Sequence, residues 1–406
     1  MKVLLSSIGS RGDVQPLLSL ALELQAMGHR ASLCVPPNFK DWVESFGLDC
    51  IPIGPDVKKL AGGSVPNKPV KPSRTRLRQL AVHTVREQFS VLADAAHECD
   101  LIIAVGALQI ATRSIAEALK IPYVFVAYCP VVLPSPNHPP PKMDTQYSQS
   151  LPAMVNRFLW MRDEQRWNVL FRATLNEERA KVGLAPIASV RPHIFTARPW
   201  LAADPALAPS SRAVGIQIVQ TGAWLLCDRT PLPEHLENFL AKGKPPIYFG
   251  FGSMQASEQT SRHLIESARA LGYRAVISQG WANLSSIDDG IDCISIGDVN
   301  HEKLFRRVAA VVHHGGGGTT TAAVRSGTPQ VVVPHLYDQY YWAYRVKKLG
   351  VGVSGPTREQ MTVQAMVSAL RECLRPEMTA RVQVLSNRME LHGAQMAAEQ
   401  LVNEFG

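Results

Sequence analysis

The chain has 406 residues, of which 46% are hydrophobic and 19% charged, and its formal net charge at pH 7 is +8. This length exceeds one ordinary hydrophobic core and predicts two domains of about 200 residues each. The basic residues are spread along the chain without the aromatic-interleaved patch of a single-strand-binding protein, so nucleic acid is not expected as a partner.

Cysteine usage and the first residues bear on the cellular compartment. The seven cysteines are widely spaced and form no C-x-x-C pair, so we expect neither disulfides nor a zinc site, and a reducing, cytoplasmic location. Met1 and Lys2 lead directly into the apolar run Val3-Leu4-Leu5, and no apolar run reaches about 18 residues. We therefore expect neither a signal peptide nor a transmembrane segment.

Short apolar strands alternate with amphipathic helices in the first half of the chain. The strand pattern covers Lys2 to Ser7, Ala31 to Val35, Leu101 to Val105 and Tyr123 to Ala127. Helical stripes lie between them, at Leu17 to Leu24 and around Ala111 to Leu119. This alternation predicts an α/β fold with a parallel, doubly wound sheet.

The second half repeats the alternation, with strands expected at 247–250, 275–278, 293–296, 310–313 and 330–333. Two such halves predict two facing Rossmann-like domains with the active site in a central cleft, beyond the carboxyl ends of the strands. The expected parts are an N-terminal domain over 1–204, a linker over 205–220, a C-terminal domain over 221–385 and a C-terminal helix over 386–406. A last helix is expected from about Pro376 to Phe405, and its end is free to pack back on either domain, including the N-terminal one.

Two proline-containing stretches interrupt the pattern and are expected to be long irregular loops of the N-terminal domain. Lys58 to Arg78 carries a basic cluster, and Val131 to Met143 is rich in proline. The basic cluster consists of Lys68, Lys71, Arg74, Arg76 and Arg78. Two interpretations stay open, because such loops either bind ligands or are solvated surface excursions.

The most specific motif is the run from His313 to Thr320, which lies between an apolar strand and a helical stretch. Its four glycines let the backbone approach an anion, and the first amides of the helix point unpaired N–H groups at it. No Gly-Lys-Ser/Thr follows, so this is not a Walker loop, and the dinucleotide fingerprint is also absent. The motif suggests a diphosphate neutralised by imidazole and amides. At most one of the adjacent histidines should face it, because successive residues of an extended chain point to opposite sides.

Asp13 lies in the turn Gly9-Ser10-Arg11-Gly12-Asp13, between the first strand and the first helix. Asp13 is placed to be the helix N-cap, with Pro16 in the first turn, and the hydrogen bonds of a cap would lower the pKa of its carboxyl. It also lies at the carboxyl end of the strand, where an acid facing the cleft belongs, so both roles stay open. Arg11 either meets a phosphate or sugar or lies on the surface.

Three further turns carry candidate ligand contacts. Ser253 follows Phe249-Gly250-Phe251-Gly252 and can donate to a phosphate oxygen. Trp281 either stacks on a base or packs, and the backbone around Val299 can meet a base edge. Asp338 and Gln339 can hold vicinal sugar hydroxyls, with a helix cap as the alternative. No Asp-x-Asp occurs, so a metal-bridged diphosphate is disfavoured and no metal site is expected.

Together these motifs resemble family 1 glycosyltransferases of the two-domain GT-B fold, above all bacterial glycopeptide-antibiotic enzymes of the vancomycin group. Sterol glucosyltransferases share the turn at 9–13. The resemblance runs nearly end to end and includes Ala202-Ala203-Asp204-Pro205, Gln220-Thr221-Gly222-Ala223-Trp224 and Gly297-Asp298-Val299-Asn300-His301. It implies an enzyme of antibiotic or other secondary metabolism, without a cofactor or metal. Such an enzyme transfers a hexose or deoxyhexose from a UDP- or dTDP-sugar to an acceptor hydroxyl with inversion.

The resemblance also implies that Asp13 is the general base. Combined with the local arguments above, it predicts three groups of donor contacts. The predicted diphosphate contacts are Ser10, Arg11, Ser253, His314, Gly316, Gly317, Gly318 and Thr319. The predicted nucleoside contacts are Trp281 and Val299, and the predicted donor-sugar contacts are Asp338 and Gln339. Glycine at position 317 departs from the common Gly-Gly-Ala-Gly-Thr form and should not block phosphate binding.

Two alternatives stay open. One is a GT-B nucleotide-sugar epimerase, which needs no acceptor, and the other is a non-catalytic nucleotide-sugar-binding module. A NAD-dependent dehydrogenase is disfavoured because neither half opens with the dinucleotide fingerprint. The sequence leaves open the base, the sugar and the oligomeric state. It also leaves open whether the small-molecule or lipid-like acceptor is a glycopeptide, polyketide, lipid or sterol.

Overall fold

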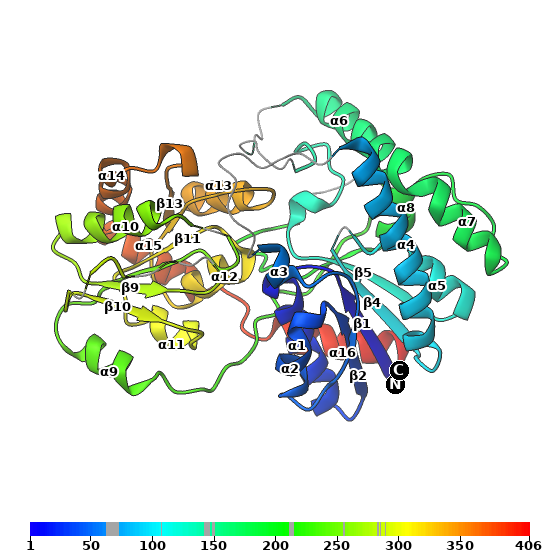
Figure 1. Ribbon diagram of the computed structural model, residues 1–406, viewed down its shortest axis with the longest axis horizontal. Coiled ribbons are helices and arrows are strands. Elements are labelled where there is room, and N and C mark those ends of the chain that lie inside the picture. The colour runs from blue at the N-terminus through cyan, green and yellow to red at the C-terminus, as the bar shows by residue number, and fades with distance from the viewer. Residues whose placement is uncertain are drawn as a thin grey trace.

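In the computed structural model the chain forms two α/β lobes that lie next to each other (Figure 1). Each lobe is built on one parallel sheet, seven-stranded in the first lobe and six-stranded in the second, among the residues described. The structure describes residues 1–61, 73–106, 108–141, 147, 151–210, 215–254, 256–281, 284, 286–288 and 290–406.

The first sheet has the order β3-β2-β1-β4-β5-β6-β7. Its strands are β1 (Lys2–Ser7), β2 (Arg30–Val35), β3 (Asp49–Pro52), β4 (Leu101–Val105), β5 (Tyr123–Ala127), β6 (Trp200–Leu201) and β7 (Val219–Gln220). The predicted bounds of β1, β4 and β5 are confirmed residue for residue, because a central parallel strand is apolar on both faces. The pattern predicts no strand at β3, β6 or β7, which are only two to four residues long.

The second sheet has the order β10-β9-β8-β11-β12-β13. Its strands are β8 (Ile247–Gly250), β9 (Ala275–Ser278), β10 (Cys293–Ile296), β11 (Ala310–His313), β12 (Gln330–Val332) and β13 (Gly352–Ser354). The five strands predicted here are confirmed, with β12 one residue shorter than expected. In both orders the chain turns from one side of the sheet to the other beside its first strand, which is where α/β sheets bind ligands.

Helices cover both faces of each sheet. The first lobe has α1 (Arg11–Ala26), α2 (Lys40–Glu44), α3 (Val57–Ala61), α4 (Arg74–Ala96), α5 (Thr112–Leu119), α6 (Ala153–Trp167), α7 (Ala173–Lys181) and α8 (Val190–Phe195). Short turns of other helix types lie at η1 (Pro37–Phe39), η2 (Pro130–Val132) and η3 (Asn168–Arg172). The remaining helices are α9 (Glu234–Ala241), α10 (Glu258–Ala270), α11 (His301–Phe305), α12 (Gly317–Arg325), α13 (Gln339–Leu349), η4 (Arg358–Gln360), α14 (Val363–Cys373), α15 (Pro376–Ser386) and α16 (Gly393–Phe405).

Successive side chains of a strand point to opposite faces of the sheet and therefore pack into two different hydrophobic clusters. In β1, Leu4 joins the buried cluster that contains Val85 of α4, whereas Leu5 joins the cluster that contains Leu17 of α1 and Leu401 of α16. The second sheet is buried in the same way, since the two sides of β8 belong to different clusters. Both faces of each sheet are therefore covered, and only the strand ends remain for ligands.

The structure corrects the prediction of one long loop from Lys58 to Arg78. This stretch contains α3 and the start of α4, whose N-cap Ser73 accepts a hydrogen bond from Arg76 N at 3.2 Å. Arg74, Arg76 and Arg78 therefore lie on an exposed helical turn, while Lys68 and Lys71 lie outside the described residues. The proline-rich stretch that begins at Val131 is irregular beyond η2 in its described part, up to residue 141, as predicted.

The single helix expected from Pro376 to Phe405 is also wrong, because the chain breaks it into α15 and α16. Figure 1 shows α16 leaving the second lobe and lying beside α1 of the first. Its buried face, which includes Ala397 and Leu401, joins the core around α1. The predicted linker ends in β7, a strand of the first sheet. We therefore propose that the N-terminal domain extends to Gln220 and that the chain changes domain between Gln220 and β8.

Candidate active site

The carboxyl ends of the strands in the two sheets face each other. Phe39, which follows β2, stacks on Trp281, which follows β9, with ring centroids 5.7 Å apart. Arg11, the first residue of α1 after β1, forms an ion pair with Asp298, which follows β10. Because ligands of open α/β sheets bind beyond the carboxyl ends of the strands, this junction is the candidate active site.

Asp13 is the third residue of α1 and not its N-cap, contrary to the prediction. The N-cap is Ser10, and Asp13 Oδ2 accepts hydrogen bonds from Ser10 N at 2.8 Å and Ser10 Oγ at 3.2 Å. This arrangement is part of a capping box, in which the third helical residue satisfies the amide of the N-cap. Pro16 lies inside the helix, past the first turn where it was expected. A Cβ on Gly9 would lie 2.3 Å from Asp13 Oδ2, so the turn needs glycine there.

Burial raises the pKa of the Asp13 carboxyl above its ordinary value, although the hydrogen bonds from Ser10 lower it. The hydrogen bonds lower the pKa of Asp13 as expected, but desolvation is the larger effect and the net shift is upward. A raised pKa suits a general base, which works best when its pKa lies near the working pH. Tyr128, the residue after β5, also fixes this turn, because its hydroxyl donates a hydrogen bond to the backbone oxygen of Asp13 at 3.1 Å.

Asp338 stands at the N-cap position of α13, but its side chain makes no capping hydrogen bond. Asp338 Oδ2 instead accepts a hydrogen bond from Trp342 Nε1 at 3.1 Å. Burial raises the pKa of Asp338 to about 6, with a further contribution from the negative charge of Asp13 and against the hydrogen bond from Trp342. Two carboxyl groups from opposite lobes thus lie within electrostatic range of each other across the cleft.

Gln339 shapes the turn that presents Asp338. Gln339 Oε1 accepts hydrogen bonds from His335 N at 2.8 Å and Leu336 N at 3.1 Å. Tyr337, between them and Asp338, has a left-handed backbone with φ of 55°, which a non-glycine residue adopts only when its surroundings hold it there. The oxygen of Gln339 is occupied, so a sugar contact from this side chain is left to its amide nitrogen.

The two histidines at the end of β11 lie in different environments. His313 is fully buried, with Nδ1 accepting from Gly315 N at 3.1 Å and Nε2 donating to Gln330 Oε1 at 2.8 Å. It is the structural histidine that the alternation predicts. His314 Nδ1 is buried without a hydrogen-bond partner in the described part of the chain, and burial lowers the pKa of His314 to about 3. The imidazole of His314 is therefore neutral at pH 7 and can offer a hydrogen bond to a ligand.

The N-terminus of α12 lies directly after these histidines. Gly316 is the N-cap and has no side chain to cap the helix, and the first helical hydrogen bond runs from Thr320 N to Gly316 O at 2.9 Å. The amides of Gly317, Gly318 and Thr319 therefore have no acceptor within the helix, and the helix dipole adds positive potential there. This is the geometry of an anion site at a helix N-terminus.

Two glycines hold the imidazole of His314 next to that helix end. A Cβ on Gly316 would lie 2.8 Å from His314 Nε2, and a Cβ on Gly252 would lie 3.0 Å from His314 Cε1. Gly252 also has a φ of 57°, which favours glycine. The turn after β8, which carries Ser253, is thus brought against the turn after β11, as the prediction of a shared diphosphate site requires.

Arg11 and Trp281 each contact the opposite lobe. Arg11 Nη1 lies 2.5 Å from Asp298 Oδ2, and its guanidinium lies 4.7 Å from the centre of the Trp42 ring. Trp281 stacks on Phe39. Val299, next to Asp298, is partly buried against the core around β8.

Sequence reasoning missed Phe39, Trp42 and the pairing of Asp298 with Arg11. A signal for the two aromatic residues was present, since Phe39 and Trp42 stand three positions apart just after the carboxyl end of β2. Nothing local in the sequence connects Asp298 with Arg11, which lies 287 positions away.

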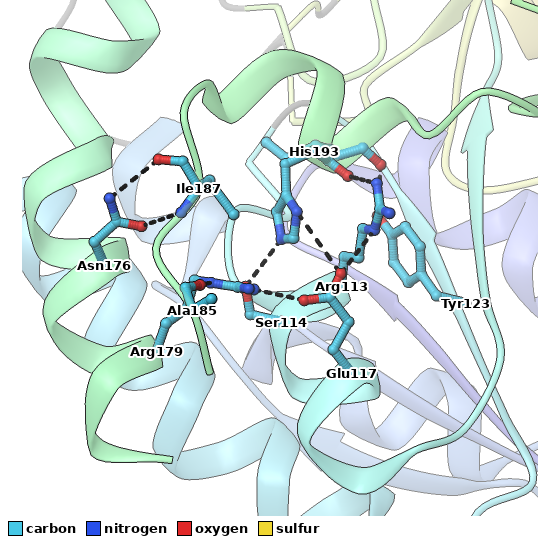
Figure 2. A network of polar contacts seen from close by, with 10 residues as sticks. Arg113, Ser114, Glu117, Tyr123, Asn176, Arg179, Ala185, Ile187 and His193 are labelled. Carbon is cyan, nitrogen blue, oxygen red and sulfur yellow. Dashed lines mark hydrogen bonds and ion pairs between the residues drawn. The ribbon is translucent and has the colours of Figure 1, made fainter. Parts of the chain in front are cut away.

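Figure 2 shows a polar cluster between α5, α7 and α8 that the sequence analysis also missed. Ser114 Oγ lies 2.9 Å from His193 Nε2, and His193 Nδ1 lies 3.9 Å from Glu117 Oε1, in the order of a nucleophile, base and acid. Ser114 is fully buried, however, and its Oγ accepts a hydrogen bond from Arg179 Nη1 at 2.8 Å. The cluster is therefore structural and ties α7 and α8 to α5.

Three general findings complete the description. All seven cysteines are free thiols. Among the described residues, no group of three or more His, Cys, Asp or Glu side chains is arranged to hold a metal ion. Within the same residues, no helix combines the length and the hydropathy that crossing a bilayer requires.

Comparison with known proteins places the chain in a family. Residues 3–134 match the glycosyltransferase family 28 N-terminal domain, and residues 264–398 match the C-terminal domain of proteins like erythromycin biosynthesis protein CIII. The chain is 40% identical to glycosyltransferase GtfE of Amycolatopsis orientalis, covering 100% of this chain and 98% of that protein. It is 39% identical to the vancomycin aglycone glucosyltransferase of the same organism, covering 99% and 97%.

A more distant relative and two solved structures extend the comparison. Sterol 3-beta-glucosyltransferase UGT80B1 of Arabidopsis thaliana is 28% identical, over 96% of this chain and 66% of that protein. The spinosyn forosaminyltransferase SpnP has a TM-score of 0.74 at 18% identity, covering 100% of this chain and 99% of SpnP. Glycosyltransferase VinC, solved in complex with dTDP, has a TM-score of 0.69 at 19% identity, covering 100% and 98%.

These likenesses show that the two parallel-sheet lobes form the GT-B fold. The chain belongs to the family of glycosyltransferases that contains GtfE and the vancomycin aglycone glucosyltransferase, and it is an enzyme of that class. The resemblance drawn from the glycine-rich turns is thereby confirmed for the family and the fold.

Proposed function

We propose that this glycosyltransferase moves a hexose or deoxyhexose from a UDP- or dTDP-sugar to a hydroxyl of a natural-product-like acceptor. Transfer inverts the anomeric carbon and uses no metal ion. The observation that carries the proposal is the position of Asp13 at the carboxyl edge of one sheet, opposite the anion site of α12 and the Asp338 carboxyl on the other. A base and a leaving-group site on facing walls are what an in-line displacement needs.

Asp13 acts as the general base in this proposal. It takes the proton of the acceptor hydroxyl while the acceptor oxygen forms a bond to the anomeric carbon from the face opposite the diphosphate. A neutral amide in place of this carboxylate could not take that proton, so Asp13→Asn should lower turnover by about 10²–10⁴. Ser10 serves Asp13 by holding its carboxyl with two hydrogen bonds, and this fixed orientation is the role we now assign to Ser10.

The diphosphate leaves as the bond to the anomeric carbon breaks. The free amides of Gly317, Gly318 and Thr319 and the N–H of His314 stabilise the charge that develops on it. Neutral hydrogen-bond donors that are already in place need no reorganisation during the reaction. The turn that carries Ser253 lies next to the N-terminus of α12, because Gly252 lies against His314. Asp338 and the Gln339 amide nitrogen hold the donor sugar.

The relatives narrow the remaining alternatives. Those compared above are transferases, which favours transfer over the epimerase alternative and over a non-catalytic module. The name of one relative specifies a glycopeptide aglycone, and we therefore propose an acceptor of that kind before a sterol, lipid or polyketide. The complex of VinC with dTDP supports dTDP as the donor nucleotide, with UDP as the alternative.

The test is a two-step assay of the purified chain. Calorimetric titration with UDP and dTDP measures nucleotide binding, and mass spectrometry of acceptors incubated with UDP- and dTDP-sugars measures transfer. Asp13→Asn should bind nucleotide like the wild type and lose transfer. The matched control is Asp100→Asn, an exposed carboxylate at the opposite edge of the same sheet, which accepts from Lys2 N at 2.7 Å. Normal turnover by Asp13→Asn, or the absence of nucleotide binding by the wild type, would overturn the proposal.

A further inference from the structure

An ion pair crosses the cleft between the lobes. Arg11 Nη1, at the start of α1, lies 2.5 Å from Asp298 Oδ2, which follows β10. The Arg11 guanidinium also lies over the ring of Trp42, 4.7 Å from its centre. The side chains of Arg11 and Asp298 are 41% and 74% exposed. The pair is therefore solvated and open to exchange with another anion.

One aromatic contact crosses the cleft next to it. Phe39 in η1 stacks on Trp281 with an interplanar angle of 24° and a centroid distance of 5.7 Å. Phe39 is 3% exposed and also contacts Trp42, at 6.2 Å between ring centroids. Trp42 thus touches both Phe39 and Arg11, so the stack and the ion pair form one connected group of contacts.

These two contacts join neighbouring strand ends on both sides. β1 and β2 are adjacent in the first sheet, and β9 and β10 are adjacent in the second. Adjacent strands lie about 4.8 Å apart, so the ion pair and the stack close the same narrow part of the cleft. That part contains Trp281 and Val299, the two residues predicted to meet the nucleoside.

The proposed anion site at the N-terminus of α12 lies further along the same edge of the second sheet. β11, which leads into α12, is separated from β10 by β9 and β8 in the sheet order. While Arg11 is bound to Asp298, its guanidinium therefore lies toward the nucleoside end and not at the α12 N-terminus. Asp13, two residues further along, interacts electrostatically with Asp338 after β12, so the turn that carries Arg11 spans the middle of the site.

We propose that Arg11–Asp298 and Phe39–Trp281 form an interdomain latch that closes the nucleoside end of the cleft, and that donor binding exchanges its contacts. Arg11 leaves Asp298 for the donor diphosphate, and the base takes the place of the Phe39 ring against Trp281. Asp298 is thereby a positioning residue, which acts on the donor only through Arg11. This inference rests on the proposed function, because it needs a nucleoside diphosphate to release the latch.

An exposed ion pair is weak, so Arg11 can exchange Asp298 for another anion. A diphosphate carries more negative charge than one carboxylate and therefore competes well for the guanidinium. Removing Asp298 should free Arg11 and tighten nucleotide binding. Calorimetric titration of Asp298→Asn with UDP and dTDP should give a Kd about two- to fivefold below that of the wild type. In an Arg11→Met background the same substitution should leave Kd unchanged.

The double-variant comparison separates the latch from simple charge repulsion between Asp298 and the nucleotide. Repulsion would tighten binding equally in both backgrounds, and that result would overturn the latch. The charge-matched control is Glu302→Gln, which removes a carboxylate from the exposed pair with Arg306 in the same lobe and should not change Kd. An unchanged or higher Kd for Asp298→Asn would also overturn the proposal.

A measurement without nucleotide keeps the latch testable if the donor class is wrong. The combined variant Asp298→Asn with Phe39→Leu, which keeps an apolar side chain at the buried position, should have a larger radius of gyration than the wild type in small-angle X-ray scattering. An equal radius would contradict the latch, whatever the nucleotide result. Failure of the wild type to bind UDP and dTDP, with a larger radius for the variant, would instead remove the donor assignment and the exchange step.

Discussion

Asp13 in the N-terminal domain and Asp338 in the C-terminal domain interact across the cleft, and the charge of Asp13 helps to raise the pKa of Asp338 to about 6. The two acids belong to strand ends more than 300 positions apart, and only the facing of the two sheets brings them into range. Carboxyl groups whose surroundings move their pKa values are frequent at active sites. The pair therefore supports a division of labour, with Asp13 at the acceptor and Asp338 at the donor sugar.

Asp338→Asn should stabilise the protein above neutral pH. Folding raises the pKa of Asp338 from 3.8 to about 6, so its favourable contribution is complete below pH 3.8 and is lost as the pH rises through 6. At pH 8 the ionised form then costs up to about 3 kcal/mol, which the neutral amide avoids. Urea denaturation at pH 5 and pH 8 should show a larger gain in the free energy of unfolding at pH 8.

The same variant should be a poorer enzyme. Loss of a charged hydrogen-bond acceptor at the donor sugar should lower kcat/KM by about ten- to a hundredfold, the effect of about 1.5–3 kcal/mol. Binding of UDP or dTDP without the sugar should not change. An equal gain in stability at both pH values, or unimpaired transfer, would contradict the role given to Asp338.

The adjacent histidines should respond in opposite ways to alanine. His313→Ala leaves Gly315 N and Gln330 Oε1 without their partner in the core, which should lower the free energy of unfolding by about 2–4 kcal/mol. His314→Ala removes a side chain whose Nδ1 is unpaired in the described structure, so stability should change little while Kd for UDP or dTDP rises. Urea denaturation and calorimetric titration of both variants check this, and a reversed pattern would exchange the two roles.

Gly316→Ala should weaken nucleotide binding because the new Cβ would lie 2.8 Å from His314 Nε2 and displace the imidazole. The backbone of Gly316 is not in the left-handed region, so the close contact is the whole effect. The control is the same substitution in a His314→Ala background, where there is no imidazole to displace and Gly316→Ala should change Kd little. Titration with UDP or dTDP should therefore show a higher Kd for Gly316→Ala only when His314 is present, and equal effects in both backgrounds would contradict the role of His314.

Arg179→Met should destabilise the first lobe. Its side chain is 7% exposed and donates to Ser114 Oγ, Glu117 Oε2 and Ala185 O, so the change removes these hydrogen bonds from a buried site (Figure 2). We expect a loss of about 3 kcal/mol, near the low end for a broken buried pair because Glu117 is 33% exposed. Arg86→Met is the control, since Arg86 is 57% exposed in its pairs and should cost less than about 1 kcal/mol. Similar denaturation midpoints for both variants would contradict the buried role of Arg179.

The central strands and the glycine-rich turns could be predicted from the sequence. β1, β8 and β11 are apolar on both faces, and that pattern is visible within the strand itself. The free amides at the N-terminus of α12 could be predicted for a similar reason, because a glycine N-cap depends on local sequence. The two-residue strands β6 and β7 could not be predicted, because two paired residues carry no pattern of their own.

Asp13 shows where a local argument failed. Its hydrogen bonds from Ser10 could be anticipated as capping bonds, but their effect on its pKa is outweighed by a desolvation that depends on distant elements. The same holds for Arg11 and Trp281, whose partners Asp298 and Phe39 belong to the opposite lobe.

Periodicity and glycine placement were enough to define two α/β sheets and the glycine-rich turns at their strand ends, because backbone geometry responds to neighbours a few positions away. The packing of α16 on α1, the approach of Asp13 to Asp338 and the closure of the nucleoside end depend on how the lobes meet. Those features arise from burial and charge shared between residues hundreds of positions apart, and no local pattern carries that information.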